Sequence, residues 1–305
     1  MLAIIIPYYK IFFFEATLIS LASQTDKRFK VYIGDDASPV APTFLLEKYK
    51  NQFDFFYHRF ENNLGGISLT QQWDRCIALM KNEEWIMILG DDDMLSDNVV
   101  ELFYDKYAEF KDCSNLIRFA SKQINEKTKI NSEIFTHPIW EKSTDFYIKK
   151  QIGQVRSSLS ECVFSRKVYN KYGFRNYPLA WHSDDLAWIE FADFKLVYAI
   201  NEAVVEFRMS FENISGKNTN FKEKALAEFY FKRDLLSEKF NFFENNQKLV
   251  LLMSFEYCLK KDREILFKEW LLLLKYYVRI GYIVPFLKCI RRLAIYYSKP
   301  FFSSY

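Results

Sequence analysis

The sequence has little glycine, little proline and almost no excess of either charge, and each shortage excludes a class of protein. Among 305 residues there are 8 glycines and 7 prolines while 50% are apolar, which excludes fibrous and disordered chains. The formal net charge of +3 is too small to indicate nucleic-acid binding on electrostatic grounds. A chain of this length can bury a substantial core, as one domain or as a domain with an appendage.

Paired cysteines and long apolar runs are missing as well. The 5 cysteines lie far apart with no Cys-x-x-Cys motif, which favours reduced core thiols over a disulfide framework or a zinc site. The apolar start of the chain ends at Tyr9 and lacks the basic leader of a signal peptide. No stretch reaches the roughly 18 uncharged residues that a membrane-spanning helix needs. We therefore expect a cytoplasmic protein, either soluble or bound peripherally to the inner face of the plasma membrane.

The first 110 residues alternate short apolar runs with helical patterns. Continuous apolar runs are typical of parallel strands buried on both faces, and strand–helix alternation predicts an α/β domain with a mostly parallel sheet. The predicted strands are residues 3–7, 30–34, 53–59 and 84–89, and the predicted helices are 13–24, 42–51 and 69–80.

The rest of the chain changes in character. Residues 112–210 give a mixed pattern, with strands expected at 115–120 and 196–199 and helices near 145–152 and 184–193. From about residue 222 onward only helical periodicity is found. We therefore predict an α/β catalytic domain over residues 1–215 and a helical C-terminal region over 216–305. The helices expected in that region are 222–240, 246–261, 262–280 and 283–297.

Acidic side chains follow two of the predicted strands. Asp35 and Asp36 follow the second strand, and Asp91, Asp92 and Asp93, here called the acidic triplet, follow the fourth. In parallel α/β sheets, ligands bind at the carboxyl ends of the strands. Adjacent carboxylates repel one another, and their oxygens suit Mg²⁺ or Mn²⁺, which in turn bridge diphosphate oxygens.

The acidic triplet also has a purely structural interpretation. It could be a solvated loop, or Asp93 or Ser96 could cap a helix over residues 97–110. The position after an apolar strand, with a second acidic strand end upstream, favours the metal-binding interpretation.

Asp184 and Asp185, here called the acidic pair, follow Trp181 and His182 and precede an apolar helical run. One carboxylate could act as a general base that takes a proton from an attacking hydroxyl group. Its neighbour would raise its pKa through like-charge repulsion, or orient it by hydrogen bonding. The alternatives are a simple charge pair at a helix N-terminus, and His182 as the base.

The order of these motifs resembles the family 2 inverting glycosyltransferases, which have the Rossmann-like GT-A fold, over residues 3–215. The resemblance implies a nucleoside pocket at the first two strand ends, a donor loop at residues 62–66, and an arginine able to meet a phosphate. A loop at Asn213, Ile214 and Ser215 resembles the family's closing loop. The residues that it assigns to the donor nucleotide are Pro7, Tyr8, Tyr9, Asp35, Asp36, Asn63, Gly65, Asp91 and Arg208.

The resemblance also implies the chemistry of the site. The acidic triplet resembles the family's metal-binding motif, with Asp92 and Asp93 as the expected ligands of Mn²⁺ or Mg²⁺, although many members have an aspartate where this chain has Gly90. The acidic pair resembles the motif that holds the base, and we favour Asp185, with Asp184 close behind. Trp181 and His182 are expected at the acceptor. Members often carry a histidine where this chain has Ser210, so a histidine metal ligand is not expected.

The predicted function is therefore metal-assisted inverting transfer of a sugar from a nucleotide-sugar donor to a hydroxyl group of an acceptor glycan. By resemblance to the family, whose commonest donors are UDP-linked, we expect a UDP-linked sugar. The resemblance implies a lipid-linked acceptor and bacterial surface polysaccharide, such as capsule, as the setting. Two alternatives stay open, a nucleotidyltransferase and a non-catalytic nucleotide- or glycan-binding module. The first usually has a glycine-rich loop after its first strand, where this chain has Pro7, Tyr8, Tyr9 and Lys10.

The end of the chain is basic. From Lys275 to Tyr305 there are six basic residues and no acidic ones, and residues 283–297 form an amphipathic helical pattern. Such a helix can lie on an anionic membrane surface, for example that of a membrane carrying a polyprenyl-diphosphate-linked acceptor. The alternative is that its apolar stripe packs on the catalytic domain or on a second subunit.

Overall fold

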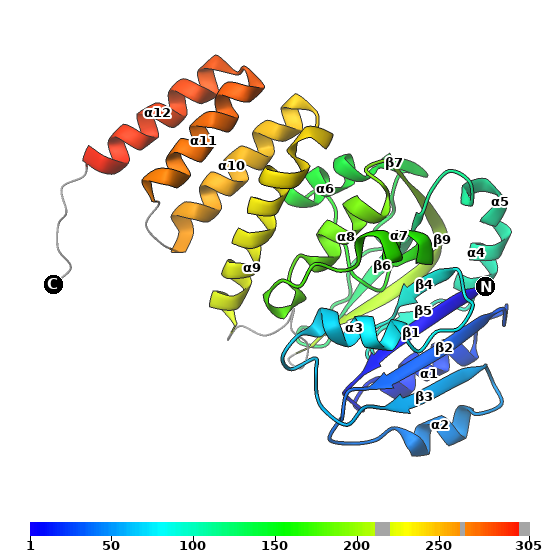
Figure 1. Cartoon of the computed structure of the whole chain (residues 1–305). Helices are drawn as coiled ribbons and strands as arrows, with labels where there is room; N and C mark the ends of the chain where they lie inside the picture. Colours follow the sequence, from blue (N-terminus) through cyan, green and yellow to red (C-terminus); the bar gives the residue numbers. More distant parts are fainter. Residues whose placement is uncertain (211–219, 263–265, 299–305) are drawn as a thin grey trace. The chain divides into compact units, whose positions relative to one another are not determined.

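The computed structural model describes residues 1–210, 220–262 and 266–298, and the chain forms two compact units, Met1–Glu223 and Lys224–Tyr305. The predicted loop at Asn213, Ile214 and Ser215 lies outside the described residues. Figure 1 shows the helices and strands of both units.

The first unit is built on one mixed sheet in the order β3-β2-β1-β4-β8-β6-β9-β5, with β7 paired to β9. The predicted α/β architecture is thus confirmed. The strands are β1 (Leu2–Tyr8), β2 (Phe29–Asp35), β3 (Phe55–Arg59), β4 (Trp85–Ile88), β5 (Met94–Leu95), β6 (Leu116–Asn125), β7 (Trp140–Lys142), β8 (Cys162–Ser165) and β9 (Leu196–Met209).

The first half of the sheet is parallel. β1 pairs with β2 and β4, and β2 pairs with β3, so that the carboxyl ends of these strands lie at one edge. The second half is mixed, because β8 runs antiparallel between β4 and β6 while β6 and β9 are parallel. The antiparallel direction of β8 brings its beginning, rather than its end, beside the carboxyl end of β4. Residues just before β8 therefore join the edge where the acidic triplet lies.

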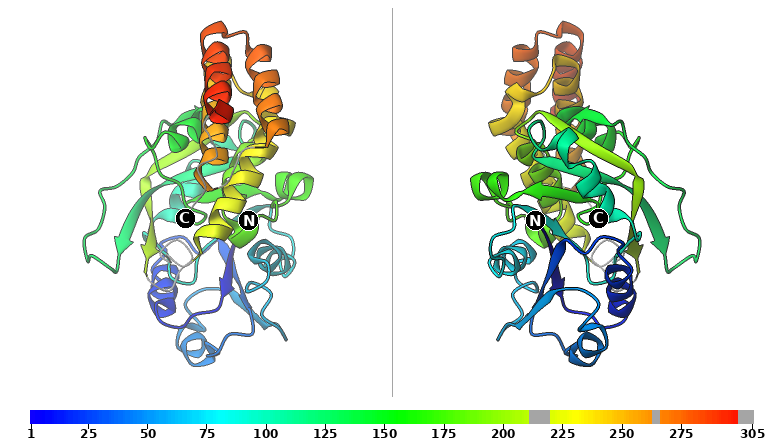
Figure 2. Two further views of the ribbon diagram at one scale, coloured as in Figure 1. Left: turned by 90° about the vertical axis from the view of Figure 1, so that its left-hand side faces the viewer. Right: turned by 90° about the vertical axis from the view of Figure 1, so that its right-hand side faces the viewer.

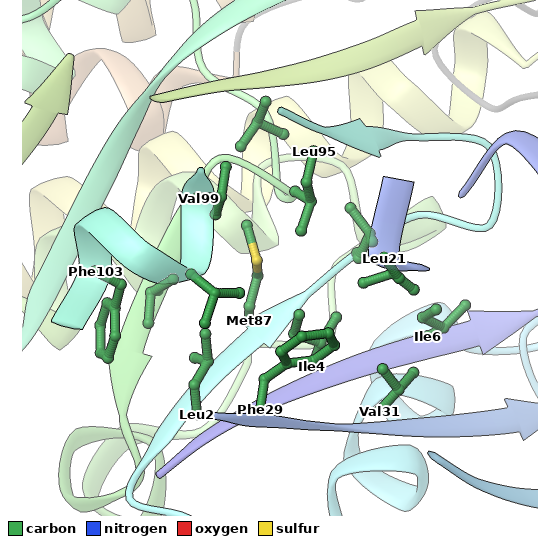
Figure 3. Packing of buried hydrophobic residues seen from close by; sticks show 14 of the residues in the cluster. Leu2, Ile4, Ile6, Leu21, Phe29, Val31, Met87, Leu95, Val99 and Phe103 are labelled. Atoms are coloured by element: carbon green, nitrogen blue, oxygen red, sulfur yellow. The ribbon is translucent and has the colours of Figure 1, made fainter. Parts of the chain in front are cut away.

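Helices cover both faces of this sheet (Figures 1 and 2). Side chains of β1 alternate between the two faces: Leu2, Ile4 and Ile6 pack with α1, α2, α4 and α5, whereas Ala3 and Ile5 pack on the side of α3, α6, α7 and α8. Figure 3 shows part of the first of these two cores. The helices are α1 (Phe14–Ala22), α2 (Thr43–Tyr49), α3 (Leu69–Ile77), α4 (Val99–Asp105), α5 (Tyr107–Phe110), α6 (Ser143–Gln151), α7 (Arg166–Tyr172) and α8 (Ser183–Phe191).

The helix predicted over residues 97–110 is observed as two helices, α4 and α5. Its first residue is Val99 and its N-cap is Asn98, which makes no side-chain capping bond. The suggested caps, Asp93 and Ser96, are therefore wrong: the Ser96 hydroxyl instead accepts from the Val204 N–H and donates to Asn98.

The second unit is helical. It holds most of α9 (Phe221–Asp234), a π-helical turn and a 3₁₀ turn, and then α10 (Asn245–Asp262), α11 (Phe267–Ile280) and α12 (Ile283–Ser298). α10, α11 and α12 lie side by side (Figures 1 and 2). Trp270, Leu273 and Tyr277 of α11 are buried at their centre, and Arg292 of α12 pairs bidentately with Glu256 of α10 at 2.5 and 2.7 Å. No helix in the described ranges is both long and apolar enough to cross a membrane.

Candidate functional site

The predicted donor residues gather at the carboxyl edge of the parallel strands. Asp35, the last residue of β2, is fully buried: one carboxylate oxygen accepts from the Ser38 N–H at 2.8 Å, and the other accepts from Tyr57 and Arg59 at 2.7 Å each. Three donors on one buried carboxylate hold it fixed in place. Asp35 therefore shapes the turn after β2, which also contains Ala37 with a left-handed backbone (φ 50°).

Asp36 holds the donor loop against this turn. Its two carboxylate oxygens accept from the N–H groups of Leu64 at 2.7 Å and Gly65 at 2.9 Å, and Arg75 pairs with it. A Cβ at Gly65 would lie 2.6 Å from an Asp36 oxygen, so this close backbone approach requires glycine. The predicted Asn63 is in the same loop, where its amide oxygen accepts from the Gly66 N–H at 2.6 Å.

The end of β1 contacts the acidic triplet directly. The N–H groups of Tyr9 and Lys10 both donate to one oxygen of Asp91 at 2.8 Å. Tyr8 is buried and its hydroxyl donates to the Val40 carbonyl, and Pro7 precedes it within β1. Burial raises the pKa of Asp91 to about 6, and the Asp92 carboxylate adds to the shift.

Asp93 is tied to Arg208 and to Ser160, a residue that no motif revealed. Its carboxylate accepts from the Arg208 N–H at 2.8 Å and from the Ser160 hydroxyl. Ser160 also accepts from the Gly90 N–H, and a Cβ at Gly90 would lie 2.8 Å from an Asp93 oxygen. The buried Asp93 thus explains why this chain has glycine at position 90. Burial raises the pKa of Asp93 to about 7, with Asp92 the next cause.

Arg208 is engaged by the protein itself. Its guanidinium donates to the Asp92 carbonyl at 3.0 Å, pairs with Glu126 and lies 4.3 Å from the centre of the Phe13 ring. An arginine held this way positions the acidic triplet, and has little freedom left to turn toward a phosphate.

Asp92 differs from its two neighbours in burial. Its side chain is half-buried, whereas Asp91 and Asp93 are buried and accept hydrogen bonds from backbone N–H and hydroxyl groups. Within the described ranges no group of three or more His, Cys, Asp or Glu side chains could hold a metal ion. Mg²⁺ is commonly bound by one or two carboxylates plus substrate phosphates, and this chemistry fits the acidic triplet.

The acidic pair begins α8 after a strained segment. Leu179, Ala180 and His182 all have positive φ (58°, 52° and 68°), a conformation that non-glycine residues rarely adopt and that often marks functional sites. The imidazole Nδ1 of His182 lies 2.7 Å from an Asp185 oxygen. Trp181, predicted at the acceptor with His182, has its ring 5.8 Å from the imidazole.

The two carboxylates of the acidic pair differ in environment. Asp185 is buried and pairs with Lys150 of α6; burial alone would raise its pKa, but Lys150 and His182 hold it well below its usual range. Asp184 is half-buried, and burial together with the Asp185 charge raises its pKa to about 6. Asp184 is thus the better proton acceptor near neutral pH.

The residues just before β8 connect the two acidic clusters. Ser160 bonds Asp93, and Cys162, two residues on, lies within electrostatic reach of Asp184. Glu161 between them pairs with Arg118 at 2.7 Å in a fully buried ion pair. One short segment of the chain therefore reaches both the acidic triplet and the acidic pair. Ser160, Lys150, Arg75 and Glu126 were missed, because their partners lie far away in the sequence.

Comparisons with known proteins agree on the fold. Residues 3–176 match the family model described as "Glycosyl transferase family 2". The chain is similar in structure to S. aureus TarS 1–349 in complex with UDP-GlcNAc, at 13% identity and a TM-score of 0.63, covering 92% of this chain and 80% of that one. The same protein in complex with UDP gives 14% identity and a TM-score of 0.59, with 93% and 82% coverage. No curated protein sequence matches the chain.

Proposed function

Because this chain belongs to glycosyl transferase family 2, we propose that it transfers a sugar from a nucleotide-sugar donor to a hydroxyl group of an acceptor glycan. The observation that supports the proposal is that one short segment reaches both acidic clusters: Ser160 is hydrogen-bonded to Asp93, and Cys162 lies within electrostatic reach of Asp184. The acidic triplet suits a diphosphate with its cation, and the acidic pair suits a general base.

We assign the donor nucleoside to the region around the ends of β1 and β2. Pro7 and Tyr8 at the end of β1, with Tyr9 just after it, would border the nucleoside on one side, and Asp36 with the loop of Asn63 and Gly65 on the other. UDP is the proposed nucleotide, in keeping with the structural neighbour that was solved with UDP-GlcNAc and with UDP. Asp35 and Asp36 act through the turn and loop that they fix.

We assign the divalent cation, Mn²⁺ or Mg²⁺, to Asp92, with Asp91 and Asp93 shaping the site. When bound, the cation would neutralise the charge that develops on the leaving diphosphate. Asp91 fixes the ends of β1 and β4 together, and Asp93 fixes β9 through the Arg208 N–H.

We assign the base to the acidic pair, with Asp184 accepting the proton of the attacking hydroxyl group. The raised pKa of Asp184 keeps the carboxylate basic, and Asp185, held by Lys150 and His182, orients the start of α8. The hydroxyl oxygen would form a bond to the anomeric carbon as the bond to the diphosphate breaks, in a single displacement that inverts the anomeric centre. Trp181 and His182 border the acceptor.

The setting that we propose is assembly of bacterial surface polysaccharide on a lipid-linked acceptor at the cytoplasmic face of the membrane. The support for membrane contact lies in α12. Ile283, Leu287, Ile290 and Tyr297 form one exposed stripe along it, with exposed fractions of 72%, 56%, 39% and 54%. The exposed cations Lys288 and Arg291 lie beside the stripe, so an anionic lipid surface complements it better than a second, equally basic copy.

The proposal is tested by following donor consumption with a panel of UDP-sugars and lipid-linked acceptor glycans. We expect release of UDP that needs both a divalent cation and an acceptor. A nucleotidyltransferase would instead release pyrophosphate from a nucleoside triphosphate, and a binding module would release neither. Either of these last two results would overturn the proposal.

A further inference from the structure

Arg156 lies in the segment between α6 and β8, within electrostatic reach of Glu161, which is itself paired with Arg118. It is half-buried, and its guanidinium lies 4.8 Å from the centre of the Phe207 ring. Its carbonyl accepts from Arg118, which helps to fix its backbone. In the described part of the chain, no group accepts a hydrogen bond from its guanidinium and no carboxylate pairs with it.

This isolation is unusual within the first unit. Arg59, Arg75, Arg118 and Arg208 each pair with a carboxylate, namely Asp35, Asp36, Glu161 and Glu126. Burying a cation without a partner is costly, since water is removed and nothing replaces it. The half-buried Arg156 bears part of this cost: burial lowers its pKa, and the nearby Glu161 charge offsets that shift only in part. A site that keeps such a cation is prepared for an anion from outside the chain.

The surroundings of Arg156 belong to the acidic triplet. Ser160, four residues later in the same segment, donates to Asp93. Phe207, under the guanidinium, immediately precedes Arg208, whose N–H donates to the other Asp93 oxygen. The two chain segments that carry Arg156 and its stacking partner Phe207 are therefore both hydrogen-bonded to the Asp93 carboxylate. We therefore expect an anion bound beside the acidic triplet to lie close to Arg156.

We propose that Arg156 binds the diphosphate of the nucleotide-sugar donor. This inference rests on the proposed function and adds to it a residue that no motif identified. Arg208, the sequence-based candidate for this role, is already held by Glu126 and the Asp92 carbonyl. A guanidinium presents a planar fork of donors that matches two phosphate oxygens, and stacking on Phe207 preorganises it.

The test compares the wild type with R156Q and R156K by calorimetric titration in the presence of Mn²⁺. UDP, GDP, CDP and dTDP are first titrated into the wild type. The nucleoside diphosphate that binds, and the corresponding nucleoside without phosphate, are then titrated into all three proteins. We expect R156Q to weaken diphosphate binding about 10- to 100-fold, as loss of a charge-assisted contact does. R156K recovers part of the affinity, and nucleoside binding is unchanged in all three proteins.

The matched control is R28Q, which removes an exposed arginine paired with Asp26. It leaves both affinities unchanged. Thermal unfolding without ligand gives a second readout, because a structural Arg156 would make R156Q less stable, whereas a binding residue leaves the midpoint equal or higher. Equal diphosphate affinity in R156Q and the wild type would overturn this inference alone. A folded wild type that binds none of the diphosphates would overturn the proposed function, and this inference with it.

Discussion

At the scale of single residues, the two neighbours Asp184 and Asp185 differ most in what surrounds them. Lys150 and His182 stabilise the ionised form of Asp185, while burial and the Asp185 charge destabilise that of Asp184. A carboxylate whose ionised form is less stabilised binds a proton more readily, and so is the stronger base. The sequence favours Asp185 by resemblance alone, whereas the contacts favour Asp184.

We predict that D184N lowers kcat by about 10²- to 10⁴-fold, the usual contribution of general-base catalysis. In the wild type the base must be ionised, so kcat falls as the pH is lowered through about 6, the pKa of Asp184. D184E keeps part of the activity with a displaced acid limb. Steady-state rates between pH 5 and 8 measure this. A separate check at each pH shows whether the proteins stay folded.

D185N is the matched variant. It leaves Lys150 without its carboxylate, so we expect a lower unfolding midpoint together with a partial loss of rate. If D185N is inactive but well folded while D184N retains most of its kcat, the roles of the two residues are reversed.

At the scale of helices and strands, close contact between β2 and α3 depends on Gly34. A Cβ at this position would overlap the Cys76 sulfur of α3 and lie 3.0 Å from Phe60. We predict that G34A lowers the free energy of unfolding by about 1–3 kcal/mol, because a packed interface must open to admit the methyl group. Chemical denaturation measures the change.

The double variant G34A/C76A controls for the cause. Removing the sulfur should recover part of the loss, giving a coupling energy between the two sites. If the losses of unfolding free energy in G34A and C76A simply add up in the double variant, the contact between β2 and α3 does not set the cost.

The same scale explains what the sequence reveals of the fold. The parallel strands were found because β1, β2 and β4 are buried on both faces and read as continuous apolar runs. β5, β7 and β8 were missed. β5 and β7 have two and three residues, too few for a period to register, and β8 is as short as β4 but lacks the longer apolar run that marks β4. β8 matters most, since its antiparallel direction places Ser160 beside Asp93.

The sequence likewise revealed only part of the candidate site. Asp91, Asp92 and Asp93 stand out because they are adjacent, and the acidic pair for the same reason. Their division of labour depends on Ser160, Lys150 and Arg208, which are distant in the sequence and meet them only in the folded chain. Arg156 gives no sequence signal. What distinguishes it is that, among the described residues, its guanidinium forms no hydrogen bond or ion pair, and this is visible only in the folded chain.

At the scale of the whole molecule, the exposed stripe of α12 predicts binding to anionic vesicles. Sedimentation with phosphatidylglycerol vesicles should retain the wild type, and phosphatidylcholine vesicles should not. The substitutions K288Q and R291Q together should cost about 2 kcal/mol of binding, at ~1 kcal/mol for each cation near the surface. L287D with I290D should abolish retention without lowering the unfolding midpoint, because both side chains are exposed.

F44D is the matched control, since Phe44 of α2 is 83% exposed and its loss should leave vesicle binding intact. A wild type that ignores both vesicles, but forms dimers that L287D with I290D dissociates, would assign the stripe to a second copy of the chain instead.

The central claim is that the carboxyl edge of the sheet binds a nucleotide-sugar together with a divalent cation. The most direct measurement is the thermal unfolding midpoint of the wild type, of D92N and of the exposed control D97N, with UDP-sugars and with or without Mn²⁺. We predict an increase in the midpoint that requires both Mn²⁺ and one nucleotide, persists in D97N and is lost in D92N. A folded wild type whose midpoint no nucleotide-sugar of any base changes would contradict the account.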